Sequence, residues 1–244
     1  MVARLSKQQP ALASWVKSNG GAATVAQALQ NAWREFHAGE FRKAIVHGEE
    51  LGALGASAAN KAAAIDSLYS NQSGAAILKM LDTAVQRAEA AVKVLPDYAN
   101  AHYLLALVLG RYSQRISILK ALAQGLAGRV RSHLERTLAL EPRHAEAHLA
   151  LGLYHAEIVN KLGSLAAALT YGASHDAALE HFRHAARMAP DSPIIHMEYA
   201  NGLMLLDGER ARTQAGEFYQ KAAACEPVDA MEWLDARRAK QGLS

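Results

Sequence analysis

The chain has 244 residues, of which 51% are hydrophobic and 20% are charged, as is usual for a soluble folded protein. Its single cysteine, Cys225, excludes an intrachain disulfide framework and a cysteine zinc cluster, and a net charge of +3 is too small to indicate nucleic-acid binding. No apolar run approaches the roughly 20 residues that span a bilayer, and no signal-peptide core follows the first residues. We therefore expect a cytoplasmic protein with no transmembrane segment.

The first part of the chain is expected to be helical. Residues 1–24 are expected to form an N-terminal helical extension that ends in the turn Ser-Asn-Gly-Gly at 18–21. A first helix pair then falls over residues 28–56. Within it, Ala-Gly-Glu-Phe at 38–41 provides a turn and the start of a second helix.

A pattern of prolines and small residues repeats along the rest of the chain. Each of four prolines follows one helical run and precedes the next: Pro96, Pro142, Pro190 and Pro227. Residues that are mostly small recur twelve and five positions before them, which allows two helices to approach closely: Ala84, Val130, Ala178 and Ala215, then Ala91, Thr137, Ala185 and Ala222. Mostly larger groups lie eight positions before and can fill the gap: Ala88, Leu134, Phe182 and Tyr219. Such a repeat predicts a solenoid of helix pairs.

The repeat resembles the tetratricopeptide repeat (TPR) over residues 84–228. The residues that fall on the TPR signature positions are Leu151, Gly152, Ala178, Phe182, Ala185 and Pro190. The turn at 38–41 fits the same motif. The resemblance implies an all-α fold, with an α-solenoid of about five TPR-type helix pairs over residues 25–228.

Two of the helix pairs are expected to contain lengthened helices. The prolines lie 46, 48 and 37 residues apart, whereas the TPR period is about 34 residues. In one repeat a leucine stripe places the start of the second helix early, near Ser117, and in the next repeat a stripe extends the first helix to the break at 171–174. The leucines that mark these two stripes include Leu119, Leu122, Leu165 and Leu169.

Long helices of this type, together with two short phrases, resemble the regulator of microtubule dynamics family and its bacterial relatives. The phrases are Gly-Arg-Tyr at 110–112 and Thr-Tyr-Gly-Ala-Ser at 170–174. The similarity covers roughly residues 75–225. That family is a variant of the TPR fold, so this resemblance implies the same architecture.

Residues 229–244 are expected to form a C-terminal capping helix. Asp229 and Glu232 have the spacing of a capping box at its start. The basic residues Arg237, Arg238 and Lys240 suit the negative end of a helix, and Gly242 is expected to stop it. A terminal helix with one polar face would keep the last repeat soluble.

Histidine is the only abundant reactive residue type, with eleven in the chain. His144 and His148 have the spacing of a helical metal-binding pair, but no acidic residue lies at a third-ligand spacing. His148 also belongs to a set that recurs six residues after a proline: His102, His148 and His196. A structural role is therefore favoured, and His181 and His184 are interpreted in the same way.

The sequence contains no catalytic constellation. Ser174, His175 and Asp176 have the letters of a hydrolase triad, but consecutive residues cannot converge on one reacting atom. A helix cap at Ser174 explains them better. A phosphate loop ending in Gly-Lys-Ser or Gly-Lys-Thr is also absent from the sequence. We therefore expect a protein that is not an enzyme and that needs no cofactor or metal.

The TPR resemblance implies a ligand surface on the inner face of the solenoid, formed by fixed positions of each first helix. The residues at these positions are Asn100, Tyr103, Leu107, Arg111, Glu146, Leu149, Leu153, Glu157, Met197, Asn201 and Met204. TPR proteins that clamp acidic peptide tails place lysines, arginines and asparagines here. This chain has one arginine, two asparagines and many apolar groups, so such a clamp is not expected.

An apolar groove with adaptable methionines suits a partner polypeptide, so the leading hypothesis is a non-catalytic TPR scaffold for protein–protein interaction. The alternative ligand is a phospholipid or another acyl chain in the same groove, since some members of the resembled family are credited with binding phospholipid. A second alternative is that the lengthened helices curl inwards and fill the groove. A structural role in homo-oligomer assembly is a further hypothesis, and the oligomeric state is left open.

A basic run over residues 111–136 is the last candidate feature. It contains six basic residues and one acid, Glu135. One interpretation is a solvated helix face, and the other is an anion-binding strip for a phospholipid head group or an acidic partner. The residues of this candidate strip are Arg115, Lys120, Arg129 and Arg131. The strip has almost no interleaved aromatic residues, so nucleic acid is not an expected partner.

Overall fold

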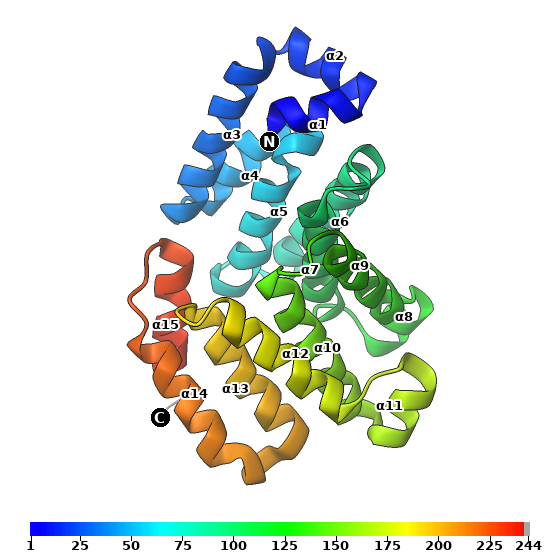
Figure 1. Cartoon of the computed structure of the whole chain (residues 1–244), viewed down its shortest axis with the longest axis vertical. Helices are drawn as coiled ribbons and strands as arrows, with labels where there is room; N and C mark the ends of the chain where they lie inside the picture. Colours follow the sequence, from blue (N-terminus) through cyan, green and yellow to red (C-terminus); the bar gives the residue numbers. More distant parts are fainter. Residues whose placement is uncertain (242–244) are drawn as a thin grey trace. The chain divides into compact units, whose positions relative to one another are not determined.

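The computed structural model describes residues 1–241, apart from the side chains of Gln8 and Ile118. Gly242, the predicted stop of the last helix, lies outside the described residues. The described part of the chain is made of α-helices and one short 3-10 helix, η1, with no strand (Figure 1). This confirms the predicted all-α fold.

The helices follow one another as a short N-terminal pair, five longer pairs and a terminal helix. The longer pairs are α3–α4, α5–α6, α7–α9, α10–α12 and α13–α14. The bounds are α1 Val2–Gln8, α2 Pro10–Ser18, α3 Gly21–His37, α4 Phe41–Glu50, α5 Gly52–Tyr69, α6 Gly74–Val94, α7 Ala99–Ser113, α8 Ile118–Ala123, α9 Leu126–Leu140, α10 Ala145–Leu162, α11 Ser164–Tyr171, α12 His175–Met188, α13 Pro193–Asp207, η1 Gly208–Ala211, α14 Arg212–Ala224 and α15 Ala230–Gln241.

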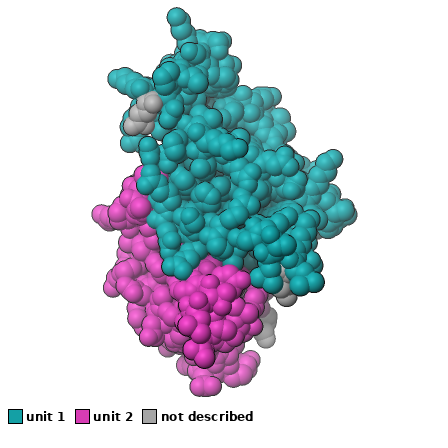
Figure 2. Space-filling model, turned by 90° about the vertical axis from the view of Figure 1, so that its right-hand side faces the viewer, with its two compact units in different colours: residues 1–136 teal, residues 137–244 magenta. Residues whose placement is uncertain are grey.

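The chain divides into two compact units, residues 1–136 and residues 137–244, which Figure 2 colours separately. In the first unit, α5 packs against α3, α4, α6 and α7 (Figure 1). Every residue of α5 from Leu54 to Ser67 is buried. Alanine and glycine make this crowding feasible: a Cβ atom on Gly55 would lie 2.2 Å from the backbone oxygen of Gly48 in α4.

The second unit is built around the fully buried ring of Phe182 in α12. Its ring lies against two glycines of neighbouring first helices, since a Cβ atom would come within 2.5 Å of it at Gly152 in α10 and within 2.2 Å at Gly202 in α13. The ring also stacks on Tyr199, with centroids 5.0 Å apart. Phe182 therefore fills the gap between the helices, as predicted for the residue eight positions before Pro190.

The small residues of the repeat lie inside the molecule, as close helix packing requires. Seven of the eight are at most 3% exposed: Ala84, Ala91, Thr137, Ala178, Ala185, Ala215 and Ala222. The eighth, Val130, is half-buried and packs against the core of the first unit. The residues at these two spacings before each proline therefore lie where the helices pack against one another.

The extra residues of the two long repeats form separate short helices, α8 and α11, rather than lengthened helices. The first begins where predicted, because the hydroxyl of Ser117 accepts a hydrogen bond of 3.3 Å from the amide of Lys120. The helix then ends at Ala123, two residues before Gly125, whose φ is +59°, and α10 ends at Leu162, directly before Gly163, whose φ is +76°. Both glycines adopt a left-handed backbone that other residues rarely take, and this interrupts each helix.

The terminal helix α15 begins with the predicted hydrogen bonds. The amide of Glu232 donates to Oδ1 of Asp229 over 2.8 Å, and Oε2 of Glu232 accepts from the amide of Val228 over 3.0 Å. Helix α15 packs against α13 and α14. The predicted limits of the N-terminal extension and of the capping helix remain predictions.

Candidate functional site

The predicted groove residues fall into two groups by exposure. Tyr103 is 5% exposed, Leu149 is 5% exposed and Met197 is 1% exposed. Met197 packs in a cluster with Ala222 of α14 and Ala239 of α15. The eight others are half-buried: Asn100, Leu107, Arg111, Glu146, Leu153, Glu157, Asn201 and Met204. Only these eight could touch a partner without movement of the core.

In the second unit, α10 and α13 pack side by side and present five of these eight residues. Leu153 and Met204 each contact the core of the unit with part of their surface and leave the rest exposed. Beside these two side chains, Asn201 links two other polar residues. Its Oδ1 accepts a hydrogen bond from the hydroxyl of Tyr219 over 2.5 Å, and its Nδ2 donates to Glu198 over 2.9 Å. The result is an apolar surface with a fixed polar edge.

The candidate basic strip is largely neutralised by acids that come from other parts of the first unit. Arg129 is paired with Glu89 of α6. Arg131 pairs with Glu135 over 2.7 Å, and the neighbouring Arg136 pairs with Asp97 over 2.7 Å. The count of a single acid within 111–136 therefore overstated the free positive charge.

The two other residues of the strip also have interactions within the first unit. Arg115 donates to the backbone oxygen of Ser67 over 2.8 Å. The ammonium of Lys120 lies 5.9 Å from the ring centroid of Tyr112, within the range of a cation–π interaction. All four residues of the strip therefore have interactions within the first unit, and anion binding by the strip remains a prediction.

The two inserted helices expose the leucines that the sequence pattern placed on the stripes of two lengthened helices. Leu119 of α8 is 79% exposed, and Leu165 and Leu169 of α11 are 76% and 79% exposed. The prediction of one continuous stripe was wrong here, because Gly125 separates α8 from α9, which follows it, and Gly163 separates α11 from α10, which precedes it. Solvent-exposed leucines of this kind are common singly and carry no function by themselves.

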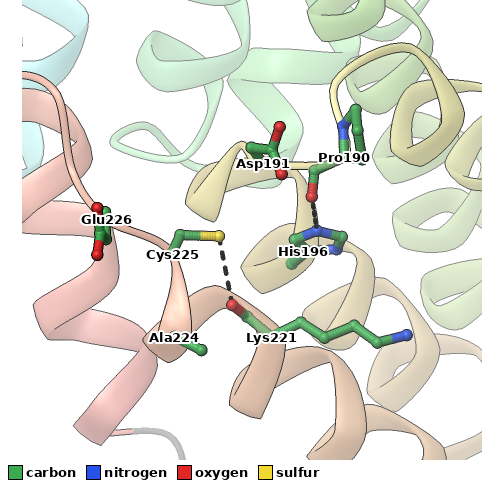
Figure 3. A pocket seen from close by; sticks show the side chains of 7 residues that line it. All are labelled: Pro190, Asp191, His196, Lys221, Ala224, Cys225 and Glu226. Atoms are coloured by element: carbon green, nitrogen blue, oxygen red, sulfur yellow. Dashed lines mark hydrogen bonds between the residues drawn. The ribbon is translucent and has the colours of Figure 1, made fainter.

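A cavity of about 660 Å³ lies in the second unit between the start of α13 and the end of α14. Figure 3 shows its lining, which is Pro190, Asp191, His196, Lys221, Ala224, Cys225 and Glu226. Burial, followed by the nearby carboxylates, raises the pKa of the Cys225 thiol, so it stays protonated near neutral pH. Side chains of both charge signs line the cavity, so its chemistry does not select one class of ligand.

Histidines of the first helices form a recurring contact that we call a histidine clasp. In the first unit, Nε2 of His102 lies 2.9 Å from the backbone oxygen of Pro96, and its Nδ1 lies 2.9 Å from Nδ1 of His133 in α9. In the second unit, Nε2 of His148 lies 3.3 Å from the oxygen of Pro142, and its Nδ1 lies 2.9 Å from Nδ1 of His181 in α12. Each clasp joins the two helices of one repeat.

The sequence alone indicated only one side of each clasp. His133 and His181 both stand nine residues before the proline that ends their repeat, and this shared spacing is the signal that could have paired them. In the third repeat the same spacing places Phe218 opposite His196, and the two rings stack with centroids 6.0 Å apart. Nε2 of His196 still contacts the oxygen of Pro190 over 2.5 Å, while its buried Nδ1 has no hydrogen-bond partner within residues 1–241.

Further imidazoles surround the clasp of the second unit. The ring of His184 lies 5.1 Å from that of His148, and the ring of His155 is stacked 5.7 Å from that of His181. Across residues 1–241, no group of three or more His, Cys, Asp or Glu side chains is arranged to hold a metal ion. None of the helices described is long and apolar enough to cross a membrane.

Comparisons with known proteins support this architecture. The sequence model of the family described as regulator of microtubule dynamics protein 1–3 matches residues 56–241. No curated protein matches the chain. Among solved structures, the crystal structure of a thermophilic TPR protein from Thermus thermophilus is similar, with a TM-score of 0.63 and 16% identity over 89% of this chain and 99% of that one. A likeness at this identity shows the fold alone, which is that of a TPR protein.

Proposed function

The chain belongs to the regulator of microtubule dynamics protein 1–3 family, and from this premise we propose that it is a non-catalytic module that binds a partner polypeptide. The TPR-type fold supports a role as an interaction scaffold. Repeat solenoids of this kind present extended surfaces for ligands rather than enclosed active sites. The proposed contact residues are the half-buried members of the predicted groove.

The observation that carries the proposal is the surface formed by Leu153 and Met204 on α10 and α13. Both side chains keep part of their apolar area exposed while their bases are fixed in the core of the second unit. Methionine adapts its shape to different apolar groups, and an amphipathic helix offers such groups at regular spacing. The polar edge at Asn201 and Glu157 would then align the backbone or polar side chains of the partner.

A phospholipid or acyl chain in the same groove is less well supported. Its negative head group would require free cations beside the apolar surface. Arg129 and Arg131 of the candidate strip are paired with Glu89 and Glu135. We therefore treat lipid binding as an outcome to be tested rather than as a second function.

The test is the pair of changes Leu153→Gln and Met204→Gln in the full chain. Partners are first captured and identified by mass spectrometry, and the affinity of a purified partner is then measured by titration calorimetry. Burial of the remaining exposed part of each side chain is worth about 1 kcal/mol, so the double variant should bind at least roughly tenfold more weakly. Far-UV circular dichroism should show unchanged helicity.

The matched control is Leu165→Gln with Leu169→Gln, the same chemical change on α11 of the same unit, where both leucines are largely exposed. This control should keep the affinity of the wild type. Equal affinity of the α10–α13 variant and the wild type would contradict the proposed surface. A third outcome is that lipid co-purifies with the wild type and is lost from the α10–α13 variant, while no polypeptide is captured. The ligand of this surface would then be a lipid and not a polypeptide.

A further inference from the structure

The histidine clasps have only one arrangement of hydrogens when both rings are neutral. A carbonyl oxygen can only accept, so Nε2 of His148 carries the hydrogen that it donates to Pro142. The neutral ring then has a lone pair on Nδ1, and Nδ1 of His181 must be the donor across the 2.9 Å contact. The same reasoning applies to His102 and His133, whose distances are 2.9 Å on both sides.

Protonation breaks this arrangement at the first-helix histidine. A proton added to Nδ1 of His148 would place two N–H groups opposite each other at 2.9 Å, with no acceptor between them. The clasp therefore holds only while His148 is neutral. A proton on Nε2 of His181 would keep the contact, but it would create a buried cation among three other imidazoles.

We propose that the two histidine clasps make the packing of α7 on α9 and of α10 on α12 sensitive to pH, so that mild acid loosens both helix pairs. This inference does not depend on the proposed partner surface. It rests on the same contact occurring at equivalent positions in two repeats, one in each unit. The third repeat, with Phe218 opposite His196, is a natural version without the titratable pair.

The groups around the second-unit clasp act on its protons in opposite directions. Burial has the largest effect and disfavours a proton on both rings; His184 disfavours one on His148 and on His181, His155 disfavours one on His181, and the carboxylate of Glu180 favours one on His148. Helix α11 carries no charged side chain. On α13, Glu198 binds Asn201 and Asp207 binds His175, so both carboxylates are engaged elsewhere.

The first-unit clasp has a mixed environment. Arg129 disfavours a proton on His133, whereas Glu89 favours one, and these two side chains are paired with each other. Besides α9, helices α5 and α6 pack against α7. Two of their charged groups are engaged elsewhere: Lys61 lies 5.5 Å from the ring centroid of Tyr103, and Arg87 is bonded to Asn60 and paired with Glu49.

The direction of the pH effect follows from these surroundings. Burial, followed by the neighbouring imidazoles, lowers the pKa of His181 to about 4, and burial also lowers the pKa values of His148 and His133. The unfolded chain then takes up these protons at higher pH than the folded chain. The stabilisation is complete above the ordinary value of 6.5 and is lost as the pH falls towards 4.

The expected size of the effect can be measured as a change in the unfolding equilibrium. For His181 alone, the difference between 6.5 and about 4 raises the unfolding equilibrium constant roughly 100-fold between pH 7 and pH 4. Urea denaturation of the full chain at several pH values gives this constant directly. Hydrogen exchange, corrected for its intrinsic pH dependence, should show protection lost first in α9 and α12.

The decisive variant is His133→Phe with His181→Phe, which copies the ring packing of the third repeat. We expect it to fold at pH 7. On acidification from pH 7 to pH 4, its unfolding equilibrium constant should rise at least tenfold less than that of the wild type. His47→Gln, which changes an exposed histidine that is paired with Glu35 outside both clasps, should leave the acid-induced loss of protection in α9 and α12 unchanged. An unchanged pH dependence in the double variant would overturn the proposal.

A second measurement keeps the proposal testable if the double variant does not fold. Long-range proton–nitrogen NMR of the wild type reports the tautomer and charge of each imidazole. We expect hydrogen on Nδ1 of His133 and His181 and on Nε2 of His102 and His148 at pH 7, with the ring of His181 still neutral at pH 5.5. Titration of His181 near 6.5, or hydrogens on the opposite nitrogens, would refute the clasps.

Discussion

Phe182 leaves no room for a side chain at position 202, and Gly202→Ala is therefore expected to destabilise the second unit. The new Cβ atom would lie 2.2 Å from Cζ and 2.5 Å from Cε2 of Phe182. Carbon atoms normally approach to about 3.5–4.0 Å. The ring cannot easily move away, because it is fully buried and stacks on Tyr199 with centroids 5.0 Å apart.

The magnitude follows from two opposing effects of the added methyl group. Overpacking of a well-filled core costs about 1–3 kcal/mol, and a contact that is more than about 1 Å too short belongs at the upper end of that range. Alanine gains about 1 kcal/mol over glycine in a helix interior. The net loss for Gly202→Ala is about 2 kcal/mol, which in a chain of this length lowers Tm by about 4–8 °C.

Urea and thermal denaturation followed by circular dichroism will measure this loss. Gly216→Ala, in α14, is the matched control, since no atom outside its own helix lies within 4 Å of its Cβ position. We expect this control to raise stability by about 0.5–1 kcal/mol. In a Phe182→Leu background, Gly202→Ala should cost less than in the wild type. Equal stability of Gly202→Ala and Gly216→Ala would refute the packing argument.

Three further predictions concern other parts of the chain. Gly55→Ala should cost more than Gly202→Ala in urea denaturation, because its Cβ atom meets a backbone oxygen of α4 at 2.2 Å and a backbone cannot rotate aside; a smaller cost would contradict the close crossing of α4 and α5. Asp229→Ala removes the side-chain acceptor at the start of α15 and should lower stability by about 1 kcal/mol, whereas Asp229→Asn should retain most of it. Glu89→Gln frees Arg129 and should strengthen sedimentation with anionic phosphatidylglycerol vesicles roughly fivefold, equivalent to about 1 kcal/mol; unchanged sedimentation would show that this arginine does not reach the surface.

The repeat could be predicted from sequence because close helix packing restricts residue size at fixed positions. Ala178 and Ala185 are 0% exposed, and the large side chain between them in sequence, Phe182, fills the space left by two glycines. A substitution at any of these positions changes volume inside a filled core. Their pattern is therefore visible without any knowledge of the partner helices.

The helix breaks could not be predicted in the same way. Gly110 and Gly128 lie inside helices, whereas Gly125 and Gly163 adopt positive φ and end them. Glycine tolerates both conformations at little cost, so its presence does not decide between them. The leucines of α8 and α11 were assigned to continuous helical stripes, since a periodic pattern continues across a break as easily as along a helix.

The pairing of the basic residues could not be predicted for a different reason. The acids that neutralise Arg129 and Arg136 are Glu89 and Asp97, which lie about forty residues earlier in the sequence. A count of charge along a short segment omits such partners, because they become neighbours only when the helices pack. The groove list met the same limit, since Met197 is buried against Ala222 of α14 and Ala239 of the terminal helix α15, which become its neighbours only when the helices pack.

The three histidine positions also show how one scaffold can hold successive repeats by different forces. The first two pairs use a hydrogen bond between imidazoles, whereas the third uses Phe218, whose ring lies 4.0 Å from that of Tyr199. Tyr199 in turn stacks on Phe182, so the last pair is joined to its neighbour by a continuous aromatic column. Aromatic stacking does not titrate between pH 7 and pH 4. Acid should therefore loosen α10 from α12 while α13 and α14 stay packed, and the order of opening within the second unit is set by which residue stands nine positions before each proline.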